Sequence, residues 1–177
     1  MAFIKTIELC LIKDSKAQDE LYNMMYSTVF NTCMRYAPNE ATGKDYIQEC
    51  FIKIFDKIDL FIGDTVAELG AWVKRLCIHY CVDQTRALKI KYSENTDLSK
   101  FESDDSEYDL ESQYTLSEIF NAIHLLSPKY KTIFNMFVLD GYSHNEITKE
   151  LGLNPGTSKA TLFKAKKKVK EILLKTT

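Results

Sequence analysis

The sequence predicts an all-α protein of two small helical domains joined by a flexible acidic linker, the C-terminal domain being a helix-turn-helix. Glycine and proline are scarce, with 6 and 3 residues in a chain of 177, whereas an all-β fold needs many turns. Apolar residues recur with a helical period on both sides of a polar segment, and no strand alternation persists. The net charge is −1 over residues 1–90, −6 over 91–115 and +5 over 116–177, which indicates three segments with different roles.

The first domain is predicted at residues 1–90, with helices at 18–36 and 42–59 and a break between them at Pro38 and Asn39. The second helix has an apolar stripe that we expect in the core, formed by Ile47, Phe51, Ile54, Phe55 and Ile58. Another face of this helix is polar, carries Asp45, Gln48, Glu49 and Asp56, and is typical of an ordinary solvated surface.

A third helix is predicted after Gly63 and Asp64. Its apolar stripe consists of Leu69, Trp72, Val73, Leu76 and Tyr80. Arg75, His79 and Arg86 share a different stripe, and their spacing alone indicates no more than surface residues.

Residues 91–115 are predicted to form a flexible linker. The segment is rich in Ser, Asp and Glu and has no apolar stripe. Such a composition buries too little apolar surface to offset the entropy lost on ordering.

The second domain, at residues 116–177, is punctuated by strong helix boundaries. A short helix at 117–126 precedes a second one that Ser127 caps and Pro128 opens. This second helix buries an apolar face and closes at Asp140 and Gly141; the face consists of Tyr130, Ile133, Phe134, Phe137 and Val138. The next helix begins with the capping box Ser143-His-Asn-Glu146, buries Ile147 and Leu151, and ends at Gly152.

The final helix opens at Asn154-Pro155, runs to about Leu174 and completes a helix-turn-helix pattern. One arc is apolar and faces the other helices: Leu162, Ala165, Val169, Ile172 and Leu173. The remaining circumference is cationic, with Lys159, Phe163, Lys164, Lys166, Lys167, Lys168 and Lys170. A helix packed on one side and cationic on the other suits a DNA major groove. Thr157 and Ser158, with the first free amides, are placed to hold a phosphate.

A lysine-rich face is more often a solvated helix face than a DNA reader. The capping box at Ser143, the turn at Gly152 and the Pro155-Gly156 start stand at the offsets of a helix-turn-helix, and together they favour DNA binding.

No catalytic, metal or cofactor site is predicted. The sequence has no Gly-rich phosphate loop and no H-E-x-x-H, and its three histidines lie on different helices, so we expect a binding protein and not an enzyme. The five cysteines include no C-x-x-C pair. Cys77 and Cys81 share a helical face, but small buried thiols are the simpler interpretation.

The N-terminal residues 1–13 contain Lys5, Glu8 and Lys13 and lack a signal-peptide pattern. No apolar run approaches the ~18 residues that span a membrane. We therefore expect a cytoplasmic protein without membrane insertion.

The first block contains the segment Asp45-Tyr-Ile-Gln-Glu-Cys-Phe-Ile-Lys, followed by Trp72-Val-Lys-Arg-Leu and Val82-Asp83-Gln-Thr-Arg86. These segments resemble the extracytoplasmic-function class of bacterial RNA polymerase sigma factors, whose pattern is D-L-V-Q-E-x-F-L-K followed by a similar helix. In the second block, three segments resemble the promoter-reading domain: Leu126-Ser-Pro-Lys-Tyr-Lys-Thr-Ile-Phe134, Gly141-Tyr-Ser-His-Asn-Glu-Ile147 and Gly156-Thr-Ser-Lys159. The resemblance covers roughly residues 10–90 and 116–175, in the family's order.

The resemblance implies a role for each surface in DNA-templated transcription initiation and its regulation. Residues expected to dock on the clamp of core RNA polymerase are Asp45, Gln48, Glu49 and Lys53. Residues expected to open and hold the minus-ten element are Lys74, Arg75, His79, Asp83 and Arg86. Residues expected at the minus-thirty-five element are Thr157, Ser158, Lys159, Ala160, Thr161, Phe163 and Lys164. The linker is expected to thread the RNA exit path of the polymerase, and an anti-sigma factor is a further partner that the family allows.

The chain departs from the family pattern at four positions. His79 replaces a usual Asn, and Ile78 replaces a frequently basic residue in the helix that holds the minus-ten strand. Ala160 and Thr161 replace a Ser and an Arg in the final helix, and the loss of the Arg removes a bidentate guanine contact. We therefore expect an atypical upstream element or a weaker dependence on it.

Two other functions are compatible with the same helices. A one-component helix-turn-helix regulator would bind specific DNA without polymerase, commonly as a dimer on palindromic sites. An anti-sigma-type or scaffold protein would bind only proteins, and removal of charge from its final helix would have no effect on promoter output.

Overall fold

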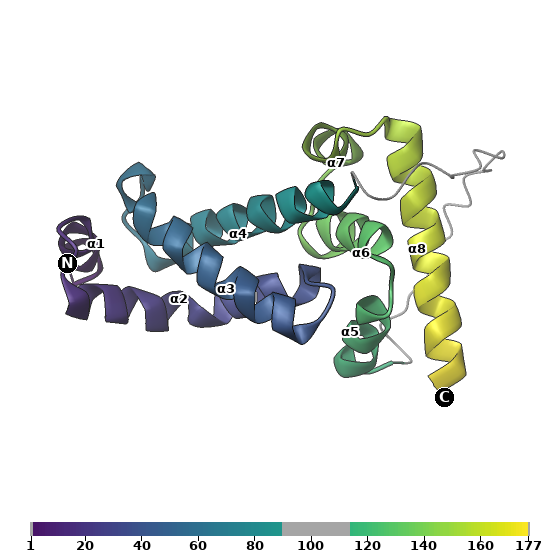
Figure 1. The fold of residues 1–177 in the computed structure, drawn as a ribbon, viewed down its shortest axis with the longest axis horizontal. Helices are drawn as coiled ribbons and strands as arrows, with labels where there is room; N and C mark the ends of the chain where they lie inside the picture. Colours follow the sequence, from purple (N-terminus) through teal and green to yellow (C-terminus); the bar gives the residue numbers. More distant parts are fainter. Residues whose placement is uncertain (1, 90–113, 177) are drawn as a thin grey trace. The chain divides into compact units, whose positions relative to one another are not determined.

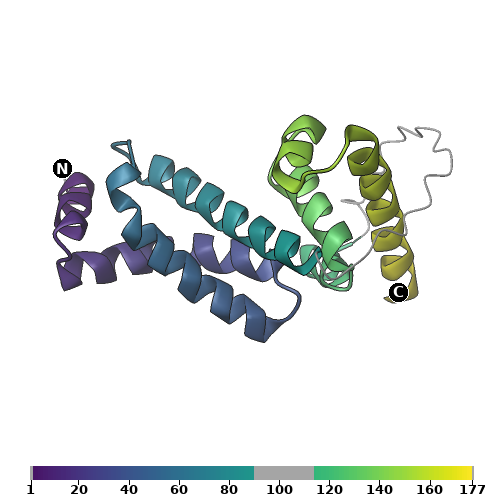
Figure 2. The same cartoon turned by 45° about the horizontal axis from the view of Figure 1, so that its top comes forward.

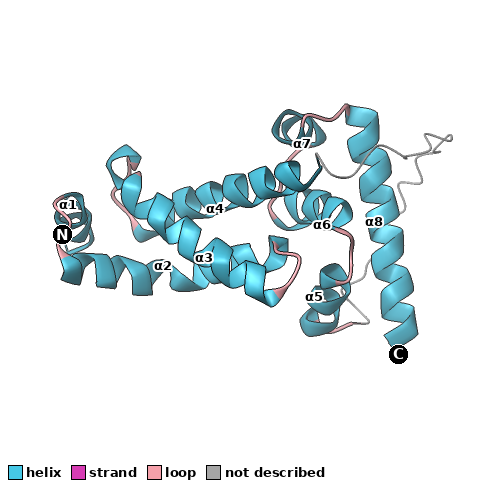
Figure 3. Ribbon diagram, in the orientation of Figure 1, coloured by secondary structure: helices cyan, strands magenta, loops and turns pink. Residues whose placement is uncertain are grey.

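The computed structural model describes residues 2–89 and 114–176, and these residues form helices and loops without a strand (Figure 1, Figure 3). The chain divides into two compact units, Met1–Asp83 and Gln84–Thr177. The predicted all-helical fold is confirmed for the described residues. The linker predicted at 91–115 lies outside them, except for its last two residues.

The first unit contains α1 (Ala2–Leu11), α2 (Ser15–Tyr36), α3 (Glu40–Asp56), the 3-10 turn η1 (Ile58–Leu60) and most of α4 (Val66–Lys89). Helix α1 packs on α2, and α2 packs on α3. The view in Figure 2, like that in Figure 1, places α2, α3 and the first part of α4 side by side.

Local capping explains where these helices begin. Asp14 accepts a hydrogen bond from the Ala17 amide at 2.9 Å, so α2 begins before the predicted Gln18. Asn39 caps α3 in the same way, through the Thr42 amide at 2.9 Å. Helix α3 also ends at Asp56, before the predicted residue 59, because the chain tightens into η1. Helix α1 is an element that the sequence analysis did not predict.

The core of the first unit lies among α2, α3 and α4. Its largest fully buried side chains are Leu21, Val29, Ile54, Leu69, Val73 and Val82. Four cysteines are also completely buried there: Cys33, Cys50, Cys77 and Cys81. The predicted apolar stripes of α3 and α4 therefore face this core, although Phe55, Trp72, Leu76 and Tyr80 are only half-buried.

The second unit contains α5 (Leu116–His124), α6 (Pro128–Phe134), the π-helical turn η2 (Asn135–Leu139), α7 (His144–Leu151) and α8 (Pro155–Thr176). Helix α8 packs against α5, α6 and α7. Side chains that form this core include Ile123, Ile133, Ile147, Ala165 and Val169.

The helix boundaries of the second unit follow the predicted signals with one exception. The capping box of Ser143 and Glu146 is present, and Gly152 ends α7 in the left-handed conformation with φ 62°. Gly141 also has positive φ, at 74°, where the chain turns after η2. Ser127 stands at the cap position of α6 but its side chain makes no capping hydrogen bond, so the start of α6 depends on Pro128.

Candidate nucleic-acid interface

Helix α8 has the two opposed faces that its sequence predicts. Leu162, Ala165, Val169 and Leu173 are buried, each with 6% exposure or less. The opposite face is exposed and carries Lys159, Phe163, Lys166, Lys167, Lys168 and Lys170. Lys164 is half-buried between these faces. One side of α8 thus anchors it to the unit while the other presents a row of ammonium groups.

The first amides of α8 are used in its own capping turn. Asn154 Oδ1 accepts a hydrogen bond from the Thr157 amide at 2.7 Å, and the Ser158 amide donates to the Asn154 carbonyl at 3.2 Å. Both amides therefore already have acceptors. The expectation that Thr157 and Ser158 hold a phosphate stays a prediction.

Two residues expected to contact DNA are buried. Ser158 has no exposed surface, and its hydroxyl lies 2.9 Å from Nδ1 of His144 on α7. Thr161 is 2% exposed. Neither side chain is presented on the surface of α8, and the expected DNA contacts of Ser158 and Thr161 stay predictions.

His144 joins the two helices of the helix-turn-helix, a role that the sequence analysis missed. Its ring stacks on Phe137 with 4.6 Å between ring centroids, while Nδ1 meets the Ser158 hydroxyl. Burial lowers the pKa of His144, and the positive charges of Lys159 and Lys166 lower it further. The imidazole is therefore held neutral and acts as a structural link between α7 and α8.

The polar stripe of α3 forms a second exposed surface. Asp45, Gln48 and Glu49 are exposed along it. Lys53 is half-buried, and its Nζ lies 5.5 Å from the centre of the Tyr80 ring on α4. This cation–π contact orients Lys53 toward α4, so it borders the acidic stripe.

A third surface runs along α4. Arg75, His79 and Asp83 are exposed, and Lys74 is half-buried. Arg86 is half-buried and falls in the second compact unit, beyond Asp83. All five expected minus-ten residues therefore lie on α4, four of them within the first unit and Arg86 within the second.

An exposed aromatic ladder on α2 also escaped the sequence analysis. Tyr22, Tyr26 and Phe30 recur every four residues and are 39%, 41% and 37% exposed. Their rings contact one another with centroid distances of 5.6 Å and 5.8 Å. The four-residue spacing in the sequence was the signal that could have revealed this ladder.

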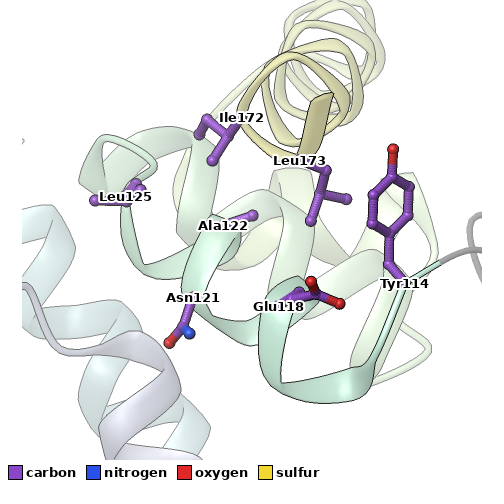
Figure 4. Close-up of a pocket in the computed structure, with 7 residues that line it drawn as sticks. All are labelled: Tyr114, Glu118, Asn121, Ala122, Leu125, Ile172 and Leu173. Atoms are coloured by element: carbon purple, nitrogen blue, oxygen red, sulfur yellow. The ribbon is translucent and has the colours of Figure 1, made fainter. Parts of the chain in front are cut away.

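A pocket of about 130 Å³ lies between α5 and α8 (Figure 4). Its lining consists of Tyr114, Glu118, Asn121, Ala122, Leu125, Ile172 and Leu173. Sites for small molecules usually enclose about 300–1,000 Å³. This pocket is too small for such a ligand and is better explained as imperfect packing of α5 on α8.

Two family profiles match the chain and together span more than half of it. The first, sigma-70 region 2, matches residues 21–89, and the second, sigma-70 region 4, matches residues 116–169. The α3 and α4 surfaces lie within the first match, and the exposed face of α8 begins within the second. Among the helices of the described ranges, none combines the length and apolar character needed to cross a membrane.

Individual proteins agree with these matches. The chain is 26% identical over 167 residues to the ECF RNA polymerase sigma-E factor of Escherichia coli K12, covering 88% of this chain and 86% of that protein. It is 22% identical over 174 residues to the ECF RNA polymerase sigma factor SigW of Bacillus subtilis 168, covering 90% of each. A solved structure of the sigma factor RpoE in complex with the anti-sigma factor NepR, from Bartonella quintana, shares the fold, with a TM-score of 0.50, 18% identity and coverage of 90% and 98%.

Proposed function

The chain belongs to the extracytoplasmic-function class of the sigma-70 family. From this membership we propose which step of transcription initiation each of its surfaces carries out. As a sigma factor it binds core RNA polymerase and directs promoter recognition. We assign a region 2-like domain to residues 1–90, an acidic linker to 91–115 and a region 4-like domain to 116–177. The protein acts by binding, and we assign it no catalytic step of its own.

The exposed face of α8 is the proposed reader of the minus-thirty-five element. The observation that carries this proposal is the cationic face directly opposite a buried one, on the second helix of a capped helix-turn-helix. Thr157, Lys159, Phe163 and Lys164 lie near the start of the helix, where base edges come within reach. Lys168 and Lys170 are three turns or more along and supply general attraction to the DNA.

Helices α3 and α4 carry the residues through which the first domain is proposed to contact core polymerase and the minus-ten strand. Asp45, Gln48 and Glu49, bordered by Lys53, form the acidic surface that docks on core polymerase. The residues assigned to the minus-ten strand are Lys74, Arg75, His79, Asp83 and Arg86. The positive charges of this second set neutralise phosphates, while the His79 ring offers a flat surface against an unstacked base.

We also propose an anti-sigma factor as a regulatory partner and the cytoplasm as the site of action. The related RpoE structure contains the anti-sigma factor NepR, which supports the first point. Core polymerase and promoter DNA are cytoplasmic in bacteria, which supports the second.

Substitution on α8 tests the proposed function of that helix. Lys159→Ala combined with Lys164→Ala is expected to lower run-off transcription from a cognate promoter at least about tenfold, since each contact contributes about 1–3 kcal/mol. The matched control is Lys5→Ala combined with Lys175→Ala, which removes the same charge from exposed positions outside the proposed reading surface. Unchanged output from the first pair, or equal loss from both pairs, would contradict this assignment of the reading surface.

A further inference from the structure

Four thiols from three helices converge in the core of the first unit. Cys33 comes from α2, Cys50 from α3, and Cys77 and Cys81 from successive turns of α4. All four are completely buried. The Sγ atoms of Cys33, Cys50 and Cys77 lie within 4.8 Å of one another, and those of Cys33 and Cys50 are 3.6 Å apart. Cys81 lies one turn further along α4 and falls outside this group of three.

These separations fit three sulfurs around a single metal ion. Zinc–sulfur bonds are about 2.3 Å long and tetrahedral, which places neighbouring sulfurs about 3.8 Å apart. The Cys33–Cys50 separation already has this value within a few tenths of an ångström. An iron–sulfur cluster needs its thiolates spread around several metal and sulfide atoms, so the 4.8 Å limit leaves room for one ion only.

We propose that the first unit binds one thiolate-preferring divalent ion, Zn²⁺, through Cys33, Cys50 and Cys77. Each coordinating thiol releases its proton to water, and no electron is transferred. The site is closed on all sides, as structural zinc sites are, so the ion enters as the unit folds. It ties α2, α3 and α4 together, and it is independent of the functions proposed for their outer surfaces.

Metal analysis of the full-length chain tests this site. We expect about one zinc per chain after expression in zinc-supplemented medium and purification under reductant. After refolding in Co²⁺ we expect sulfur-to-cobalt charge-transfer bands and the intense visible bands of a tetrahedral ion. Cys33→Ser, Cys50→Ser and Cys77→Ser should each lower metal content at least about tenfold. Cys10→Ser is the matched control, because Cys10 is also buried in this unit but lies on α1, outside the cluster.

A second measurement keeps the test decisive if a serine variant fails to fold. X-ray absorption at the zinc edge of the wild-type protein should show sulfur ligands at about 2.3 Å. A folded wild-type chain that retains less than about a tenth of an ion, or an absorption shell of nitrogen and oxygen, would overturn the proposal. A disulfide between Cys33 and Cys50 in the purified chain, with no bound metal, would overturn it as well.

Discussion

At the scale of single residues, His144 shows how a polar side chain specifies the helix-turn-helix. Its ring lies on Phe137, and its Nδ1 meets the buried hydroxyl of Ser158 at 2.9 Å. This pair connects α7 to α8 and fixes the rotation of α8 about its own axis. The outward direction of Lys159 therefore depends on a contact on the opposite side of the helix.

Acidification should weaken the second unit through this histidine. The pKa of His144 is lowered in the folded state, whereas in the unfolded chain it is about 6.5. Stability is therefore complete above about pH 6.5, and it falls below that pH because the unfolded chain binds the proton more readily. Thermal unfolding of the full chain between pH 7.5 and about pH 5 should show this loss.

Variants identify the group responsible. His144→Gln should reduce the pH dependence, leaving a part due to His124, whose pKa is also lowered by burial and by Lys131. His79→Gln is the control substitution, because it changes a histidine on α4 outside the second unit. A His144→Gln profile identical to that of the wild type would contradict the role given to this ring.

Residue burial was only partly predictable from the sequence. A step of 100° per residue correctly placed Leu162, Ala165 and Val169 inside. It did not reveal that Ser158 and Thr161 are buried, because this depends on how deeply neighbouring helices approach α8. For Ser158 the approaching group is His144, which lies 14 residues earlier in the chain.

At the scale of secondary-structure elements, the turn between α7 and α8 depends on a left-handed residue. Gly152 has φ 62°, and a Cβ added there would meet no atom within 4 Å. The penalty for a side chain at this position is therefore purely conformational. Gly70 offers a comparison, because it has equally open space but lies within helix α4.

Alanine at these two glycines should have opposite effects. Gly152→Ala is expected to destabilise the chain by about 1–2 kcal/mol, since the left-handed conformation is unfavourable for a residue with Cβ. Gly70→Ala is expected to stabilise it by up to about 1 kcal/mol, since alanine loses less entropy in a helix. Urea unfolding measures both differences. Destabilisation by both substitutions would contradict this explanation, because it would indicate that steric space and not backbone conformation determines the change in stability.

The charge on α8 should be visible in the salt dependence of promoter binding. If Lys159 and Lys164 each neutralise one phosphate, each alanine substitution should reduce the slope of log K against log salt by about 0.9. Titrations of the holoenzyme on a promoter fragment at several potassium concentrations give this slope. Lys175→Ala should leave the slope unchanged. A wild-type slope for Lys159→Ala would show that Lys159 does not contact a phosphate.

Capped elements were the most predictable part of the fold. The capping box at Ser143 and Glu146 and the end of α7 at Gly152 depend on neighbours within a few residues, so the sequence pattern identified both. Helix α1 and the 3-10 turn η1 were missed. Both pack on elements distant in sequence, and their own residues carry weaker boundary signals.

At the scale of the whole molecule, polymerase binding is assigned to the first unit through the acidic stripe of α3. Asp45→Lys combined with Glu49→Lys should weaken binding to core RNA polymerase at least about tenfold, because it reverses the charge of the proposed docking surface. Glu8→Lys combined with Asp19→Lys is the matched control, because both residues are exposed and lie on α1 and α2, outside the stripe. Competition against a labelled sigma factor measures the affinities, and equal weakening by both pairs would indicate only a general charge effect.

The order of the two helical blocks and their charge asymmetry were predictable because they are properties of long segments. The convergence of Cys33, Cys50 and Cys77 was not, because 16 or more residues separate each from the next and no C-x-x-C spacing marks them. Only the packing of α2, α3 and α4 brings these thiols together. Sequence spacing thus recovers sites within one helix better than sites assembled from several.

The central claim is that this chain directs core RNA polymerase to promoters, and reconstituted transcription tests it most directly. The purified full-length protein is incubated with bacterial core polymerase, its binding is measured, and run-off transcription is performed on a library of promoter fragments from the source genome. We predict stoichiometric binding and new start sites that share one upstream sequence pattern. Failure to bind the polymerase, together with specific binding of duplex DNA by the protein alone, would contradict the account and indicate a helix-turn-helix regulator.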